Sequence, residues 1–222
     1  MTIAQRINDI TKELPASTRL IAVSKFHPEA AIREAYEAGQ RIFGESKVQE
    51  LLAKEEALPQ DIEWHFIGHL QTNKVRFIVP FVHLIHSVDS IKLAEEINRQ
   101  AQKAGRTVDV LLQVHIAQEE TKFGFSPDEC LAFLSGKAWQ QYTHVRIRGL
   151  MGMATFTENE AQIRTEYQTL SALFNKIQQE HFPGGDFNEL SMGMSDDYPI
   201  AIAEGSTLVR VGSRIFGNRI YS

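Results

Sequence analysis

The chain has 222 residues, of which 43% are hydrophobic and 23% are charged, and its formal net charge is −5 at pH 7. This composition is typical of a globular domain, and the acidic balance excludes a general nucleic-acid binder, which carries a basic face. A single cysteine, Cys130, excludes an internal disulfide. With no secretory signal and no apolar stretch long enough to span a bilayer, a cytoplasmic location is expected.

Short apolar runs alternate with segments of helical periodicity along the chain. The predicted strands cover residues 20–24, 41–44, 63–68, 83–87, 107–115, 145–151, 187–192 and 207–212. The predicted helices cover 3–14, 29–38, 47–57, 72–79, 90–104, 126–134, 158–181 and 196–203. Ser90 and Ser126 stand where an N-cap is expected, and Gly39 and Gly105 stand where a left-handed C-cap is expected.

Eight repeats of strand and helix imply parallel strands, because each connection must cross back over the sheet. The predicted fold is therefore a single (β/α)8 TIM barrel with an extra N-terminal helix. An open, doubly wound sheet is the alternative. Since no linker, charge block or repeat divides the chain, we expect one domain over residues 1–222.

Lys25 follows the first predicted strand directly, before Phe26-His27-Pro28 ends it. In a barrel, reactive groups lie at the carboxyl ends of the strands. A lysine there points its amine into the mouth of the fold, where desolvation can make an amine nucleophilic. The simpler interpretation is a solvated loop lysine, as most lysines are.

Two turns of small residues follow the seventh and eighth predicted strands, where barrels often bind phosphate. Met194 and Ser195 belong to the first turn, and Gly212 and Ser213 to the second. Their backbone N–H groups and hydroxyls are the donors that a phosphate prefers, although small residues also form tight turns that bind nothing. An amine combined with a phosphate cradle suggests an aldehyde-bearing phosphate ligand, and pyridoxal 5′-phosphate (PLP) is the obvious candidate.

Arg210 alternates with Leu208 and Gly212 in the eighth strand and should face the barrel interior. A buried guanidinium needs an acceptor. A neutral pyridine nitrogen would supply one, and an internal carboxylate such as Glu45 would serve nearly as well.

Other candidate groups indicate no chemistry. His83 and His86 are expected on opposite faces of a strand, and no carboxylate–histidine cluster is expected around His65 and His69. Cys130 lies in a helical pattern without a neighbouring cation and is expected to be an inert core thiol. The sequence carries no Walker, dinucleotide-fingerprint or G-x-S-x-G motif.

Taken together, these segments resemble the YggS family of pyridoxal phosphate homeostasis proteins, over nearly the whole chain. The matching stretches are Ala22-Val23-Ser24-Lys25, Phe43-Gly44-Glu45 with Val48-Gln49-Glu50, Trp64-His65-Phe66-Ile67-Gly68, Leu70-Gln71-Thr72-Asn73-Lys74, His86-Ser87-Val88-Asp89, Lys122-Phe123-Gly124, Arg148-Gly149-Leu150-Met151, residues 190–197 and residues 209–217.

The resemblance implies an alanine-racemase-like barrel with PLP held as a Schiff base on Lys25. It further implies that Met194, Ser195, Gly212 and Ser213 hold the phosphate and that Arg210 faces the pyridine nitrogen. Ser46 and Lys47 depart from the family's usual Asn-Tyr at this place, so one ring contact differs.

The function expected from this resemblance is a monomeric carrier or buffer of PLP in vitamin B6 homeostasis, affecting amino-acid and keto-acid pools, with no catalytic activity. Apo-enzymes that accept PLP are the expected partners, and Lys47, Lys74 or Lys122 are candidate way stations for transfer. The alternatives are a PLP-dependent racemase and a sugar-phosphate aldolase that uses Lys25 without a cofactor.

Overall fold

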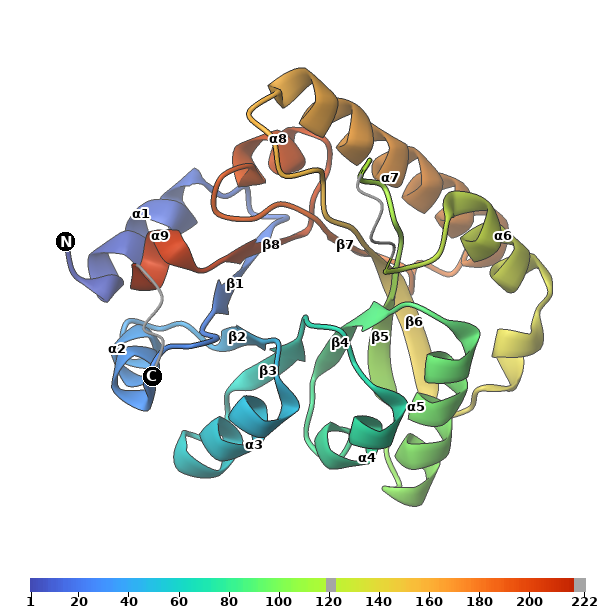
Figure 1. Cartoon of the computed structure of the whole chain (residues 1–222), viewed down its shortest axis with the longest axis horizontal. Helices are drawn as coiled ribbons and strands as arrows, with labels where there is room; N and C mark the ends of the chain where they lie inside the picture. Colours follow the sequence, from blue (N-terminus) through green and yellow to red (C-terminus); the bar gives the residue numbers. More distant parts are fainter. Residues whose placement is uncertain (119–122, 218–222) are drawn as a thin grey trace.

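Eight parallel strands close into a barrel in chain order in the computed structural model, which describes residues 1–118 and 123–217 (Figure 1). The strands are β1 (Arg19–Val23), β2 (Ile42–Glu45), β3 (Glu63–Phe66), β4 (Leu84–Val88), β5 (Val108–Gln113), β6 (Val145–Met151), β7 (Glu189–Ser191) and β8 (Leu208–Val211). The barrel closes where β8 pairs with β1, with Leu20 opposite Val209. The predicted barrel is confirmed, and the open doubly wound sheet is wrong.

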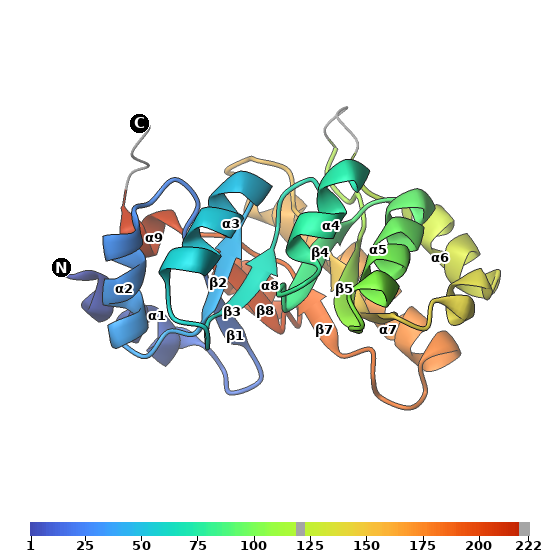
Figure 2. The same cartoon turned by 90° about the horizontal axis from the view of Figure 1, so that it is seen from below.

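A ring of helices surrounds the strands, as Figures 1 and 2 show from two directions. The α-helices are α1 (Ile3–Glu13), α2 (Glu29–Glu37), α3 (Val48–Ala57), α4 (Val75–Ile78), α5 (Ile91–Lys103), α6 (Pro127–Ser135), α7 (Glu160–His181), α8 (Tyr198–Ala203) and α9 (Ser213–Phe216). Two 3-10 helices are η1 (Thr72–Lys74) and η2 (Ala138–Gln141). The extra helix α1 lies beside α9, where the Arg6 side chain donates to the carbonyl of Ile215 at 3.1 Å.

Helix boundaries follow the local signals in the sequence. Ser90 caps α5 and Ser126 caps α6, each accepting a backbone N–H of the first turn. Gly39 and Gly105 have φ values of +100° and +64°, as expected of left-handed residues after α2 and α5. The single helix predicted over 72–79 is instead η1 followed by one turn of α4, and η2 and α9 were not predicted.

The hydrophobic core has two parts. The larger part lies between the barrel and its helices and includes Cys130, whose thiol pKa is raised to about 12 by burial. The smaller part gathers buried side chains from five strands, namely Ile21, Leu84, Leu111, Met151 and Leu208. Within the described residues, no helix is both long enough and apolar enough to cross a membrane.

Candidate functional site

A cavity of about 710 Å³ opens at the carboxyl ends of the strands. All six residues predicted for the site line it, namely Lys25, Met194, Ser195, Arg210, Gly212 and Ser213. Lys25 directly follows β1, Met194 and Ser195 follow β7, and the others lie in or directly after β8. β1 is far from β7 and β8 in the sequence, yet the closed barrel places these strands side by side. Closure of the sheet therefore brings the predicted amine and both small-residue turns to one opening.

The backbone on both sides of Lys25 is held by helix α3. The Lys54 ammonium donates to the carbonyl of Ser24 at 2.8 Å, and the Phe26 N–H donates to Glu50 Oε1 at 2.6 Å. Phe26 has a φ of 65°, a left-handed conformation that is strained for an aromatic residue and persists where its surroundings impose it. The Lys47 ammonium also lies 4.6 Å from the centre of the Phe26 ring. These contacts fix the direction in which Lys25 leaves the strand.

Glu45 joins this arrangement from β2. It accepts hydrogen bonds from the Ser24 hydroxyl at 2.6 Å and from Lys54 at 2.7 Å, while its Oε2 is buried without a partner among the described residues. Burial raises the pKa of the Glu45 carboxyl to about 7, against the lowering effect of Lys54. The proposed pairing of Glu45 with Arg210 is wrong, because its charged partner is Lys54.

The two small-residue turns contact each other and are supported from outside. The Met194 N–H donates to Asp197 Oδ1 at 2.5 Å, and the Tyr167 hydroxyl donates to Asp197 Oδ2 at 2.8 Å. The Gly212 N–H donates to Ser195 Oγ at 3.2 Å, which joins the second turn to the first. A side chain at 212 would place its Cβ 3.1 Å from the carbonyl of Val23, so glycine permits the close approach of β8 to β1.

Arg210 points into the barrel from β8 and is 5% exposed. It donates to Ser191 Oγ at 2.5 Å and to the carbonyl of Gly152 at 3.0 Å, so both acceptors are neutral. Burial lowers the pKa of its guanidinium, against the raising effects of Tyr167 and Asp197. A fixed cation therefore stands in the wall of the cavity without a direct carboxylate contact in the described chain.

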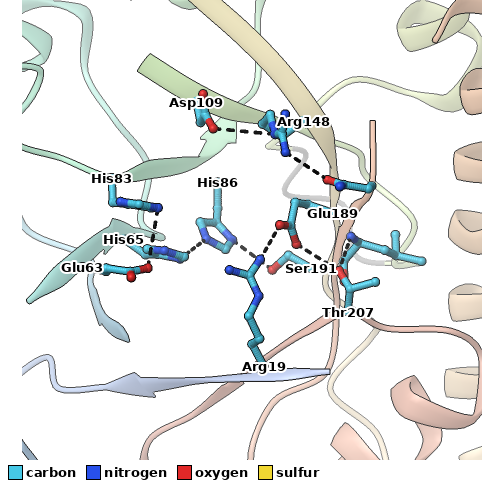
Figure 3. Close-up of polar contacts among 12 residues, drawn as sticks. Arg19, Glu63, His65, His83, His86, Asp109, Arg148, Glu189, Ser191 and Thr207 are labelled. Carbon is cyan, nitrogen blue, oxygen red and sulfur yellow. Dashed lines mark hydrogen bonds and ion pairs between the residues drawn. The ribbon is translucent and has the colours of Figure 1, made fainter. Parts of the chain in front are cut away.

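Ser191, which accepts from Arg210, begins a line of polar side chains that continues through His86 to His65 (Figure 3). Ser191 Oγ lies 2.9 Å from His86 Nδ1, and His86 Nε2 lies 3.0 Å from His65 Nδ1. Burial lowers the pKa of both imidazoles well below 6.5 and keeps them neutral. His65 also lies near Glu63 and His83. The expectation of no carboxylate–histidine cluster is therefore wrong, since strand pairing brings together residues that the sequence separates.

Sequence reasoning missed part of the cavity wall. His27 and the segment Thr155-Phe156-Thr157 line the cavity, as does Asp197. The segment follows β6 at the carboxyl edge of the barrel, so the barrel rule itself was a signal that could have found it. The supports from Glu50 and Lys54 carried no such signal, because helical charged residues usually lie on a solvated face.

Among the described residues, those named as departures and way stations lie outside the cavity wall. Ser46 and Lys47 are not among the described residues that line it, although Lys47 contacts Phe26 next to Lys25. Lys74 does not line the cavity either, and its ammonium lies 5.8 Å from the Phe77 ring centre. Lys122 lies outside the described residues.

The fold and site together define an alanine-racemase-like barrel with its binding cavity at the carboxyl edge. The family model for the alanine racemase N-terminal domain matches residues 1–219. Alanine racemase from Streptomyces coelicolor A3(2) shares this fold, with a TM-score of 0.76 at 20% identity over 97% of this chain and 57% of that chain.

Relatives with higher sequence identity identify the family within this fold. Pyridoxal phosphate homeostasis proteins from Aquifex aeolicus and Haemophilus influenzae are 42% and 38% identical, covering 91% and 99% of this chain and 88% and 94% of their own. PipY from Synechococcus elongatus, solved with PLP bound, is 43% identical with a TM-score of 0.88, covering 97% of this chain and 100% of that one. The chain belongs to the family of pyridoxal phosphate homeostasis proteins.

Proposed function

We propose that this protein binds PLP in the cavity at the carboxyl edge of the barrel and acts as a carrier of the cofactor in vitamin B6 homeostasis. The observation that carries the proposal is the meeting of one amine, Lys25, with two small-residue turns and a buried arginine around a single cavity. The PLP-bound structure of PipY supports the same ligand.

Each group has a distinct part in the proposed binding. The amine of Lys25 condenses with the aldehyde of the cofactor and releases one water. The C=N bond that forms is a Schiff base. The turns at Met194-Ser195 and Gly212-Ser213 supply hydroxyl and N–H donors to the phosphate. Arg210 faces the pyridine nitrogen and keeps it unprotonated. The PLP ring acts as an electron sink when its nitrogen is protonated. A cation beside that nitrogen opposes its protonation and so weakens the electron sink.

This arrangement favours storage and delivery over catalysis. Two-base racemisation needs a second acid or base on the far face of the substrate. Two charged side chains that line the described cavity are engaged elsewhere: Asp197 accepts from Met194 and Tyr167, and Arg210 donates to Ser191 and Gly152. We therefore propose one monomeric, cytoplasmic cofactor-binding domain without racemase activity, which releases PLP to the amines of apo-enzymes by exchange of the imine.

The test locates the bond. Purified protein is incubated with PLP, reduced with borohydride, digested and analysed by mass spectrometry. We expect the pyridoxyl group on the peptide that holds Lys25, and loss of both the adduct and the visible absorbance band in Lys25→Ala. Lys74→Ala is the matched control and should bind as the natural protein does. An adduct on another lysine, or an unchanged band in Lys25→Ala, contradicts the proposal.

A second assay separates carrier from enzyme and from aldolase. The loaded protein is offered alanine and serine, and racemisation is followed by chiral chromatography; we expect none. Transfer to an apo-enzyme is measured in parallel, where Lys47→Ala tests the candidate way station that contacts Phe26 next to Lys25. A colourless protein that is trapped instead by a ketose phosphate would favour the aldolase.

A further inference from the structure

Three potential metal ligands meet at the amino end of two neighbouring strands, on the side of the barrel away from the cavity (Figure 3). Glu63 begins β3, His65 follows two residues later on the same face, and His83 directly precedes β4. One ligand atom of each lies within 4.8 Å of the other two, and Glu63 Oε2 is 3.6 Å from His83 Nε2.

His65 supplies an independent sign that something binds there. The residue is 1% exposed, yet its Nε2 has no hydrogen-bond partner among the described residues. Its other nitrogen, Nδ1, is already used by His86 at 3.0 Å. A buried polar atom without a partner costs about 1–3 kcal/mol, so native proteins rarely leave one.

The direction of the hydrogen bonds does not remove this deficit. Arg210 can only donate to Ser191. If Ser191 then donates to His86, the line ends in an unpaired N–H at His65; if His86 donates to Ser191, it ends in an unpaired lone pair at His65. A lone pair on a buried, neutral imidazole is what a metal ion requires.

We propose that Glu63, His65 and His83 bind one divalent transition-metal ion, with zinc as the best-fitting metal. Two imidazoles and one carboxylate are a set that zinc uses while keeping a further position for water. Four bonds of about 2.0–2.1 Å in a tetrahedron around zinc place the ligand atoms roughly 3.4 Å apart. This is close to the 3.6 Å between Glu63 Oε2 and His83 Nε2. The ligand atoms of all three residues lie within 4.8 Å of one another, so side-chain movement must bring the His65 ligand atom onto the same ion.

The surroundings suit such a site. The side chains of His83 and Glu63 are 53% and 40% exposed, so an ion reaches them from solvent. When His65 Nδ1 carries the proton and donates to His86 Nε2, the lone pair of His65 Nε2 is left for the metal; histidine ligands are usually oriented in this way. Because residues at the amino end of a TIM barrel serve stability, we infer that the ion stabilises the fold and takes no part in binding at the opposite mouth.

The test uses the full-length protein without a histidine tag, stripped by a chelator and dialysed. It is titrated with Co²⁺, whose visible d–d bands report its coordination, and then with Zn²⁺ as competitor. We expect one equivalent of Co²⁺ to bind, Zn²⁺ to displace it, and saturating Zn²⁺ to raise Tm. Glu63→Gln and His83→Ala, both at the surface, should each weaken binding at least about tenfold.

Controls separate this site from incidental binding. His69 also pairs with a carboxylate, Asp89, at 2.9 Å, so His69→Ala is a matched control that should leave Co²⁺ binding unchanged. His65→Asn keeps a donor toward His86 but removes Nε2, and should abolish binding. Absence of one-equivalent binding, or unchanged affinity in both Glu63→Gln and His83→Ala, overturns the proposal and leaves a buried water as the partner of His65. If His65→Asn fails to fold, the two surface variants decide.

Discussion

The two mouths of the barrel are lined by different kinds of chemical groups. At the carboxyl mouth, small residues and backbone groups surround a cavity of about 710 Å³. At the amino mouth, long charged side chains pair directly across strands, as Arg19 does with Glu189 and Arg146 with Asp109 at 2.6 Å. The contrast shows how one fold keeps an open mouth for a ligand and closes the other with side chains. Arg210, Ser191, His86 and His65 form the hydrogen-bonded line that joins the two.

The largest loss of stability is expected from adding a side chain to the first small-residue turn at the carboxyl mouth. Gly193 has a φ of +93°, and a Cβ there would lie 2.6 Å from the Cβ of Ala201 and 2.9 Å from the Cα of Tyr198. Gly193→Val should therefore lower the free energy of unfolding by about 3 kcal/mol or more. Urea denaturation measures it. Gly184→Ala, where no atom lies within 4 Å, is the control and should change little.

Removing one member of the hydrogen-bonded line between the two mouths is expected to cause the next largest loss of stability. Ser191→Ala removes the shared partner of Arg210 and His86, which leaves two buried groups short of a hydrogen bond. The free energy of unfolding should fall by about 2 kcal/mol. Ser87→Ala on β4, next to His86, is the matched control, because its buried hydroxyl has no partner among the described residues. Equal losses in the two variants would mean that the line contributes nothing beyond packing.

The pH dependence of the free energy of unfolding tests Glu45, which belongs to the group of side chains that holds the backbone around Lys25. With its pKa raised from 4.5 to about 7, folded Glu45 holds its proton where the unfolded chain has lost it. Its contribution to stability therefore declines as pH rises from about 4.5 to 7 and is constant above that range. Glu45→Gln cannot titrate, so its unfolding free energy should decline less between pH 5 and 7. An identical decline in both proteins would contradict the raised pKa.

The smallest effect is expected at the surface of the amino mouth. The side chains of Arg146 and Asp109 are 61% and 20% exposed, so water screens their ion pair. Arg146→Ala should cost no more than about 1 kcal/mol, and the loss should shrink in high salt. Thermal unfolding at low and high salt measures both. A loss as large as that of Ser191→Ala would remove the distinction between pairs at the rim and the buried line.

Most of the fold follows from local patterns that the sequence displays openly. Alternating apolar runs and helical segments predict eight parallel strands, and caps such as Ser126 mark where helices begin. The short helices η2 and α9 were missed because four residues carry too little periodicity to stand out. The predicted helix over 72–79 divides because η1 passes into α4 after three residues.

The carboxyl mouth was easier to predict than the amino mouth for a physical reason. Lys25, Arg210 and Gly212 occupy strand ends, where the barrel rule gives position a meaning. The contact of His65 with His83 depends on the register of β3 against β4, which places His65 opposite Leu84, and no local pattern encodes register. The hold of Lys54 and Glu50 on the Lys25 backbone depends likewise on how α3 packs.

The seam where β8 returns to β1 has a consequence for biosynthesis. Lys25 is synthesised long before Gly212, whose turn packs against Val23. A nascent chain that has not yet reached β8 cannot present both halves of the cavity, because contacts between such distant segments form late in folding. Truncated products that lack β8 and the turn after it will expose the amine with only part of its cradle, so capture of the ligand becomes a report that translation has passed Ser213.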